Sequence, residues 1–120
     1  PGVHDVRVYA QGAYQDLLVL PNDIAAPSLK TDNPYMQMRG NEVFKLAVNS
    51  LGDVADEIIL NNHLPKHEID WLIPHQANLR IIQALAKRLD LSMDRIILTL
   101  AEQGNTSTAS IPLAYHQGVL

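Results

Sequence analysis

The sequence contains no cysteine. This absence excludes disulfide bonds, zinc sites built on thiolates and a thiol nucleophile within these 120 residues. It is also typical of proteins kept in a reducing compartment, so we expect a cytoplasmic protein. Any chemistry within this stretch must rely on other side chains.

An excess of positive charge, long apolar runs and phosphate-binding loops are missing as well. The formal net charge of -4 argues against a general nucleic-acid binder, whose surface would be basic. No apolar run approaches the roughly 20 residues needed to cross a bilayer, and no signal peptide is visible, so we expect no membrane association. The sequence has neither a glycine-rich phosphate loop nor the G-x-S-x-G pattern of a nucleophile elbow. With 47% hydrophobic and 18% charged residues, the composition is that of an ordinary globular domain.

The chain begins with Pro1 rather than methionine, so we expect residues 1–120 to be part of a longer protein.

Hydrophobic periodicity predicts alternating strands and helices. The expected elements are, in order, strands at 3–9 and 16–20 joined by a turn at 11–15, a surface loop at 21–40, a helix at about 41–61 with Asn41 as its N-cap, a strand at about 69–74, a helix at about 78–89 capped by Asn78, a strand at about 95–100, a turn at 101–105 and a helix at about 107–118. This order indicates an α/β fold with a largely parallel sheet covered by helices.

Two polar residues follow the last two predicted strands. His75 comes directly after the strand at 69–74, and Asn105 follows the strand at 95–100 by a few residues. Ligands in open α/β sheets bind beyond the carboxyl ends of the strands, so both residues should reach the same edge. Neither is a good nucleophile, but the imidazole Nε2–H and the amide N–H can both donate to one carbonyl oxygen and stabilise negative charge developing there. The pair therefore suits enolate or oxyanion chemistry on a thioester or ketone, with a reacting partner from elsewhere.

Structural explanations for these residues also stand. A lone histidine after a strand is commonly structural, and Gly104 with Asn105 could simply form a turn. His63 and His67 have a helical spacing, but Pro65 between them argues against a metal site, and none is expected. For His4 and His116 the sequence offers no partner, so surface positions are expected. The basic face of the helix at 78–89 is either a solvated surface or a docking site for an acidic protein; its cations are Arg80, Lys87 and Arg88.

The segments "DWLIPHQANLRII" and, about thirty residues later, "GNTSTASIP" resemble the C-terminal half of β-ketoacyl-acyl-carrier-protein synthase III, a thiolase-fold condensing enzyme. The segments "GNEVFKLAV" and "GAYQDLLVLPN" are similar to the same family, and the similarity covers nearly the whole chain in order. The resemblance implies a partial, C-terminal thiolase-like α/β domain over residues 1–120, with a mostly parallel or mixed sheet. It also implies that the matching layer of such a fold lies outside these residues, which would leave the helix at 41–61 incompletely covered.

The family's reaction and residues follow from this resemblance. Such enzymes start type II fatty-acid synthesis by condensing an acyl-CoA primer, expected to be acetyl-CoA, with malonyl-acyl carrier protein, and they need no metal or other cofactor. The resemblance implies that His75 and Asn105 hold the malonyl thioester carbonyl while carbon dioxide leaves. It places Phe44 on the wall of the acyl and pantetheine channel, and Gly40 and Asn78 near the pantetheine arm. The cations implied to dock the acyl carrier protein are Lys45, Arg80, Lys87 and Arg88. The enzyme is expected to be a cytoplasmic homodimer.

One departure from the family pattern leaves alternatives open. The nucleophilic cysteine of the family belongs to its N-terminal half, so the 120 residues alone are expected to be inactive in condensation. A related thiolase-fold acyltransferase of secondary metabolism would carry the same segments. A non-catalytic module for carrier-protein binding or dimerisation, or a malonyl-thioester decarboxylase that needs only the two polar residues, would also fit the sequence.

Overall fold

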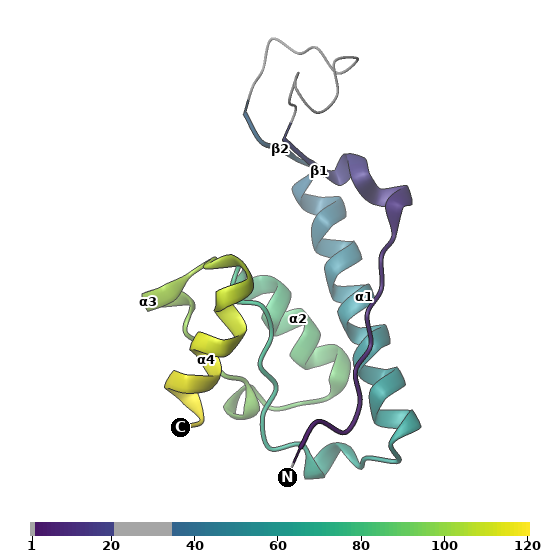
Figure 1. Ribbon diagram of the computed structural model, residues 1–120, viewed down its shortest axis with the longest axis vertical. Helices are drawn as coiled ribbons and strands as arrows, with labels where there is room; N and C mark the ends of the chain where they lie inside the picture. The colour runs from purple at the N-terminus through teal and green to yellow at the C-terminus, as the bar shows by residue number, and fades with distance from the viewer. Residues whose placement is uncertain (1, 21–34) are drawn as a thin grey trace. The chain divides into compact units, whose positions relative to one another are not determined.

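The computed structural model describes residues 2–20 and 35–120 and divides into two compact units (Figure 1). The smaller unit is Val8–Ala47, and the larger consists of the residues up to Arg7 together with Val48–Leu120. The division falls within the long helix α1 (Gly40–Asn61), so that its beginning belongs to the smaller unit.

The smaller unit contains a short antiparallel ladder. The 3-10 helix η1 (Gly12–Leu17) leads into β1 (Leu18–Val19), which pairs with β2 (Gln37–Met38). The turn predicted at 11–15 is therefore mostly helical, and the strand predicted at 16–20 is reduced to two residues. Of the loop predicted at 21–40, residues 21–34 lie outside the described residues, whereas 37–38 form a strand. The backbone N–H of Arg39 continues this pairing by donating to the Leu17 carbonyl over 2.9 Å.

The N-terminal segment forms no strand, so the prediction for residues 3–9 is wrong. The alternation of apolar and polar residues is present, but a strand also needs a partner for its backbone groups. Instead, side chains attach the segment to the end of α1. Arg7 donates to Glu57 over 2.8 Å, and the Asn62 amide donates to Asp5 over 2.8 Å.

Helix α1 occupies the region where a helix is predicted, but it begins one residue early. The Val43 N–H donates to the Arg39 carbonyl over 2.9 Å, which makes Arg39, not Asn41, the N-cap residue. The apolar stripe of this helix is only half-buried, and Gly52 is its one fully buried residue. The helix is thus incompletely covered by the described residues, as the sequence leads us to expect.

Helix α2 (Leu79–Leu89) supplies most of the core of the larger unit. Its predicted apolar face is buried, and Ala55 of α1 and Leu72 pack against it. The buried residues of this core are Ile82, Leu85, Ala86, Leu89, Leu91 and Ile96. Each large side chain buried in this way contributes about 1.5–3 kcal/mol. The core therefore fixes α2 against the two extended segments that lead to the candidate site.

The strands predicted at 69–74 and 95–100 form only one bridge, between Leu72 and Ile96. This bridge is parallel, as predicted for neighbouring strands of the sheet. The ladder extends no further because Pro74 has no N–H to donate, and because the Thr99 N–H bonds to a side chain instead of a strand. Leu100 is already in the short helix α3 (Leu100–Gln103), which also replaces most of the turn predicted at 101–105.

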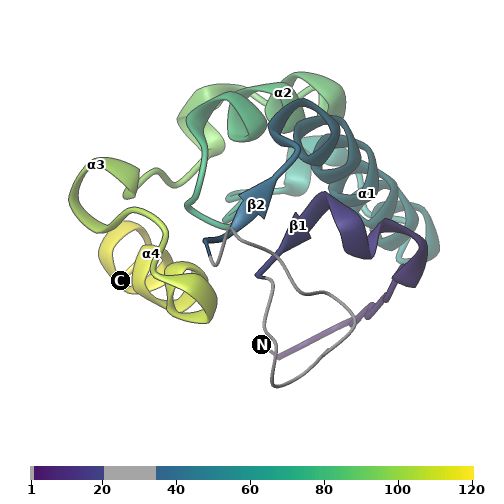
Figure 2. The same ribbon diagram turned by 90° about the horizontal axis from the view of Figure 1, so that it is seen from above.

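The C-terminal region is helical, in the range predicted for a helix at 107–118. The 3-10 helix η5 (Ser107–Ala109) leads directly into α4 (Ser110–Gly118), and Figure 2 shows the chain passing from α3 through a loop into α4. Among residues 2–20 and 35–120, no helix is both long and apolar enough to span a membrane.

Candidate active site at the ends of two parallel segments

The two parallel segments bring the residues after them to one edge of the larger unit. The Leu72 N–H donates to the Arg95 carbonyl over 2.8 Å, and the Ile97 N–H donates to the Leu72 carbonyl over 3.1 Å. These bonds fix the register of the two parallel segments, so His75, which follows the first segment, and Thr99, which ends the second, lie at the same edge. The prediction that the carboxyl ends of the two segments meet at one edge depends on this parallel register.

Gln76 holds the two segments together at this edge. Its side chain is fully buried, and its amide nitrogen donates to the carbonyls of Pro74 and Ile97 at 2.9 and 3.1 Å. Its amide oxygen accepts the Thr99 N–H at 2.8 Å. An amide side chain is suited to this position because it carries donors and an acceptor together. No role for Gln76 can be predicted from the sequence, since only the three-dimensional pairing shows which backbone groups it bonds to.

His75 is anchored through one ring nitrogen. Its Nδ1 lies 2.6 Å from the Ser110 hydroxyl oxygen, which also accepts the Gln76 N–H at 3.3 Å. Ser110 is 1% exposed, whereas His75 itself is exposed. The ring is therefore fixed on its buried side and open on the other. Ser110 was also missed by sequence reasoning, because its bond to His75 spans 35 positions.

Asn105 is held beside His75 by its backbone. Its N–H donates to the Gln76 carbonyl over 2.8 Å, and its φ of 52° lies in the left-handed region. Gly104 is required just before it, because a Cβ there would lie 2.8 Å from the Leu100 carbonyl oxygen. Ser107, with φ of 56°, is strained in the same way, and such strain persists where the surrounding structure enforces it. The structure thus brings Asn105 and His75 to the same edge, while their chemical roles stay predictions.

Unpaired polar atoms flank Asn105. Within the described residues, three buried side-chain oxygens have no hydrogen-bond partner: Thr99 Oγ1, Gln103 Oε1 and Thr106 Oγ1. Buried polar atoms are normally paired, and two of these three, on Gln103 and Thr106, lie within two positions of Asn105.

The predicted docking cations on α2 are not equivalent. Arg80 and Lys87 are exposed, but Arg88 lies across α1, where it donates to the Asn49 carbonyl over 2.8 Å and to Asp53. The hydrogen bond to Asp53 and the charges of Asp53 and Asp56 raise the pKa of Arg88 above its ordinary value, although desolvation opposes them. Arg88 is thus engaged in joining α2 to α1, and its place in a docking surface stays a prediction.

The predicted channel residues lie on two helices. Gly40 and Phe44 are on the first turns of α1, where Gly40 is exposed and Phe44 half-buried. Lys45, predicted to dock the carrier protein, follows Phe44 on the same helix and is exposed. Asn78 caps α2, and its side-chain oxygen accepts the Arg80 N–H over 2.9 Å. This bond uses the side-chain oxygen of Asn78 and not its amide N–H groups.

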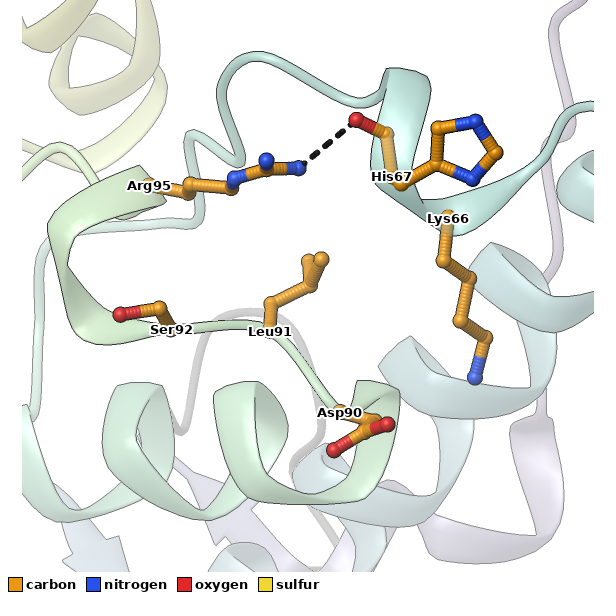
Figure 3. A pocket seen from close by; sticks show the side chains of 6 residues that line it. All are labelled: Lys66, His67, Asp90, Leu91, Ser92 and Arg95. Carbon is orange, nitrogen blue, oxygen red and sulfur yellow. Dashed lines mark hydrogen bonds between the residues drawn. The ribbon is translucent and has the colours of Figure 1, made fainter.

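A separate cavity of about 470 Å³ lies at the opposite end of the parallel segments. Figure 3 shows the Leu91 side chain entering it between Arg95 and Lys66, with Arg95 donating to the His67 carbonyl over 3.0 Å. His67 lines this cavity, but His63, which precedes it by four positions, does not. Among the described residues, no group of three histidine, cysteine or acidic side chains could hold a metal ion.

Comparison with known proteins identifies the family to which the chain is similar. Residues 59–120, more than half of the chain, match the sequence profile described as 3-oxoacyl-[acyl-carrier-protein (ACP)] synthase III C terminal. The beta-ketoacyl-[acyl-carrier-protein] synthase III of Methylococcus capsulatus is 50% identical over 119 residues, and that of Salmonella arizonae is 50% identical over 120. These alignments cover 99% of this chain but 37% of each relative, so the chain spans little more than a third of their length.

Solved structures show the same relationship. The 3-oxoacyl-(acyl carrier protein) synthase III of Pseudomonas aeruginosa aligns with a TM-score of 0.79 and 35% identity, covering 92% of this chain and 32% of that one. The enzyme of Aquifex aeolicus aligns with a TM-score of 0.77 and 38% identity, over 92% and 33%. The predicted fold class, an α/β arrangement forming the C-terminal part of a thiolase-like fold, is confirmed by these likenesses.

Proposed function

Because the chain belongs to the 3-oxoacyl-[acyl-carrier-protein] synthase III family, we propose that it forms the malonyl-activating part of a condensing enzyme that starts type II fatty-acid synthesis. The proposed reaction is a decarboxylative Claisen condensation between an acyl-CoA primer and malonyl-acyl carrier protein. The observation that carries the proposal is the placement of His75 and Asn105, on either side of the buried Gln76.

The two residues act on the malonyl thioester. The bond between its carboxylate and its α-carbon breaks, carbon dioxide leaves, and the electron pair forms an enolate. His75 Nε2–H and the Asn105 amide N–H donate to the enolate oxygen, which stabilises the charge without a base or a metal. The enolate carbon then attacks the carbonyl carbon of an acyl thioester on a cysteine, which the family resemblance assigns to the N-terminal half of such enzymes. A carbon–carbon bond forms, the bond between that carbonyl carbon and the cysteine sulfur breaks, and the cysteine leaves as a thiolate.

Further parts of the proposal concern the substrates. Acetyl-CoA is the expected primer, and Phe44 would give the acyl and pantetheine channel an apolar wall that favours loss of a charged carboxylate. Gly40 and Asn78 would lie along the pantetheine arm, and no cofactor is required beyond the thioester substrates.

The protein partners follow from charge and exposure. The acidic acyl carrier protein would dock on cations of both helices, namely Lys45 of α1 and Arg80, Lys87 and Arg88 of α2; all but Arg88 are exposed. We also place the enzyme in the cytoplasm as a homodimer. The larger unit has large apolar side chains that are exposed, such as Trp71 (45% exposed) and Leu60 (73% exposed). Their exposure supports the proposal that this unit packs against further protein surface.

Decarboxylation of a malonyl thioester tests the proposal. In the whole enzyme, whose N-terminal half is expected to carry the nucleophilic cysteine, His75→Ala and Asn105→Ala should each lower the rate of carbon dioxide release by about 10² while leaving transfer of the primer acyl group to that cysteine unchanged. His67→Ala is the matched control, because this histidine lines the separate cavity. Normal decarboxylation in both site variants would refute the assigned roles.

The products of the same assay separate the alternatives. Carbon dioxide release coupled to a new carbon–carbon bond identifies a condensing enzyme, whereas release alone identifies a decarboxylase. No release from any malonyl thioester would leave only a non-catalytic docking or dimerisation module.

A further inference from the structure

Ser110 occupies a position from which it can decide which nitrogen of His75 carries the proton. Its hydroxyl oxygen lies 2.6 Å from His75 Nδ1 and 3.3 Å from the Gln76 backbone nitrogen. A backbone N–H can only donate, so the Ser110 oxygen must accept from Gln76. The hydroxyl hydrogen of Ser110 is then left to find an acceptor.

The only acceptor that the described residues offer this hydrogen is His75 Nδ1. Were Nδ1 protonated instead, the ring would donate to Ser110, and the serine hydrogen would be buried without a partner, since Ser110 is 1% exposed. Leaving a buried donor unpaired is costly, so the arrangement favours an unprotonated Nδ1. In a neutral imidazole the proton must then reside on Nε2.

We infer that Ser110 is a positioning residue that holds neutral His75 in its Nε2–H tautomer, with the donor directed away from the buried side of the ring. The functional meaning of this assignment rests on the proposed function, because an Nε2–H is the group required to donate to an enolate oxygen. The hydrogen bonds run in one direction, from the Gln76 N–H to Ser110 and from Ser110 to His75. The position of the chain at Gln76 is itself fixed by its buried side-chain amide.

The tautomer can be measured directly by 15N NMR of the imidazole ring, at a pH where the same spectrum shows the ring to be neutral. The unsubstituted protein should show His75 protonated on Nε2. Ser110→Ala should give a mixture of both tautomers, while Thr108→Val, which removes a hydroxyl from an exposed residue two positions earlier, should leave the spectrum unchanged. Protonation on Nδ1 in the unsubstituted protein would overturn the inference without any variant having to fold.

The rate of malonyl-thioester decarboxylation provides the second readout. Ser110→Ala should slow it roughly tenfold, as expected for a group that orients a functional imidazole, and less than His75→Ala does. An unchanged tautomer in a folded Ser110→Ala variant would overturn the inference. If the tautomer shifts as expected but His75→Ala decarboxylates normally, the proposed function fails and the assignment of Ser110 stands.

Discussion

At the scale of single residues, the buried Gln76 shows how one side chain replaces part of a sheet. The two parallel segments share only one bridge, and beyond it three backbone groups point to the space between them. The Gln76 amide bonds to all three, two carbonyls and one N–H. The residues on either side of this amide, His75 in sequence and Asn105 in space, are those assigned to the enolate. The geometry of the site therefore depends on a residue that would not itself touch substrate.

We predict that Gln76→Leu lowers the free energy of unfolding by roughly 3 kcal/mol or more, because three buried backbone groups lose their partner. Gln76→Glu keeps the shape but directs a carboxylate at two carbonyl oxygens, which should raise the pKa of the introduced carboxyl in the folded state. A protonated carboxyl has one O–H donor for these two carbonyls, so part of the penalty is present at every pH. The pH-dependent part is absent below the unfolded pKa of about 4.3 and grows as pH rises toward the raised folded value. Denaturant unfolding of both variants from pH 4 to 8 measures this. A Glu variant whose difference from the unsubstituted protein is constant over that range would contradict the prediction.

At the scale of elements, the helices α1, α2 and α4 were predictable, whereas the extent of the strands was not. The periodicity behind α1 and α2 and the cap at Asn78 are local features, with bonds between residues two to four positions apart. A strand becomes regular only when another strand pairs with it, and alternation at 3–9 carries no information about a partner. The convergence of His75 and Asn105 could be foreseen from chain order, because the two segments are parallel. Gln76 and Ser110 could not, because their bonds depend on contacts 21 to 35 positions apart.

Variants of Asn78 can separate its structural role, as the N-cap of α2, from a role in binding substrate. Asn78→Ala removes the acceptor of the Arg80 N–H and should lower the free energy of unfolding by about 1 kcal/mol. Asn78→Ser restores a capping oxygen, so its stability should return close to that of the unsubstituted protein. Denaturant unfolding measures the first effect, and the KM for malonyl-acyl carrier protein measures the second. A serine variant that is stable but has a raised KM supports contact of the amide with the pantetheine arm, whereas recovery of both quantities assigns Asn78 to capping alone.

At the scale of the whole molecule, charge is distributed unevenly for a chain with a net charge of -4. Cations gather on α2, where Arg80 and Lys87 lie one above the other, two turns apart on its exposed face. Arg88 has a different task, because its bonds to Asp53 and to the carbonyls of α1 tie two helices together. Helix α2 thus combines a buried face that forms the core, an edge that contacts α1 and an exposed face suited to an acidic partner.

Reversing one of these charges should weaken binding of an acidic carrier protein without affecting the use of acyl-CoA. We predict that Arg80→Glu lowers the affinity for acyl carrier protein by about tenfold at low salt, mainly through slower association, and by less as salt screens the charges. Lys66→Glu is the matched control: it makes the same change of charge at the separate cavity, and it disturbs only a contact of 4.0 Å with Asp56 between partly exposed side chains. Association rates measured at two salt concentrations distinguish the cases. Equal losses in the two variants would mean that overall charge attracts the carrier protein and that the exposed face of α2 is not its docking surface.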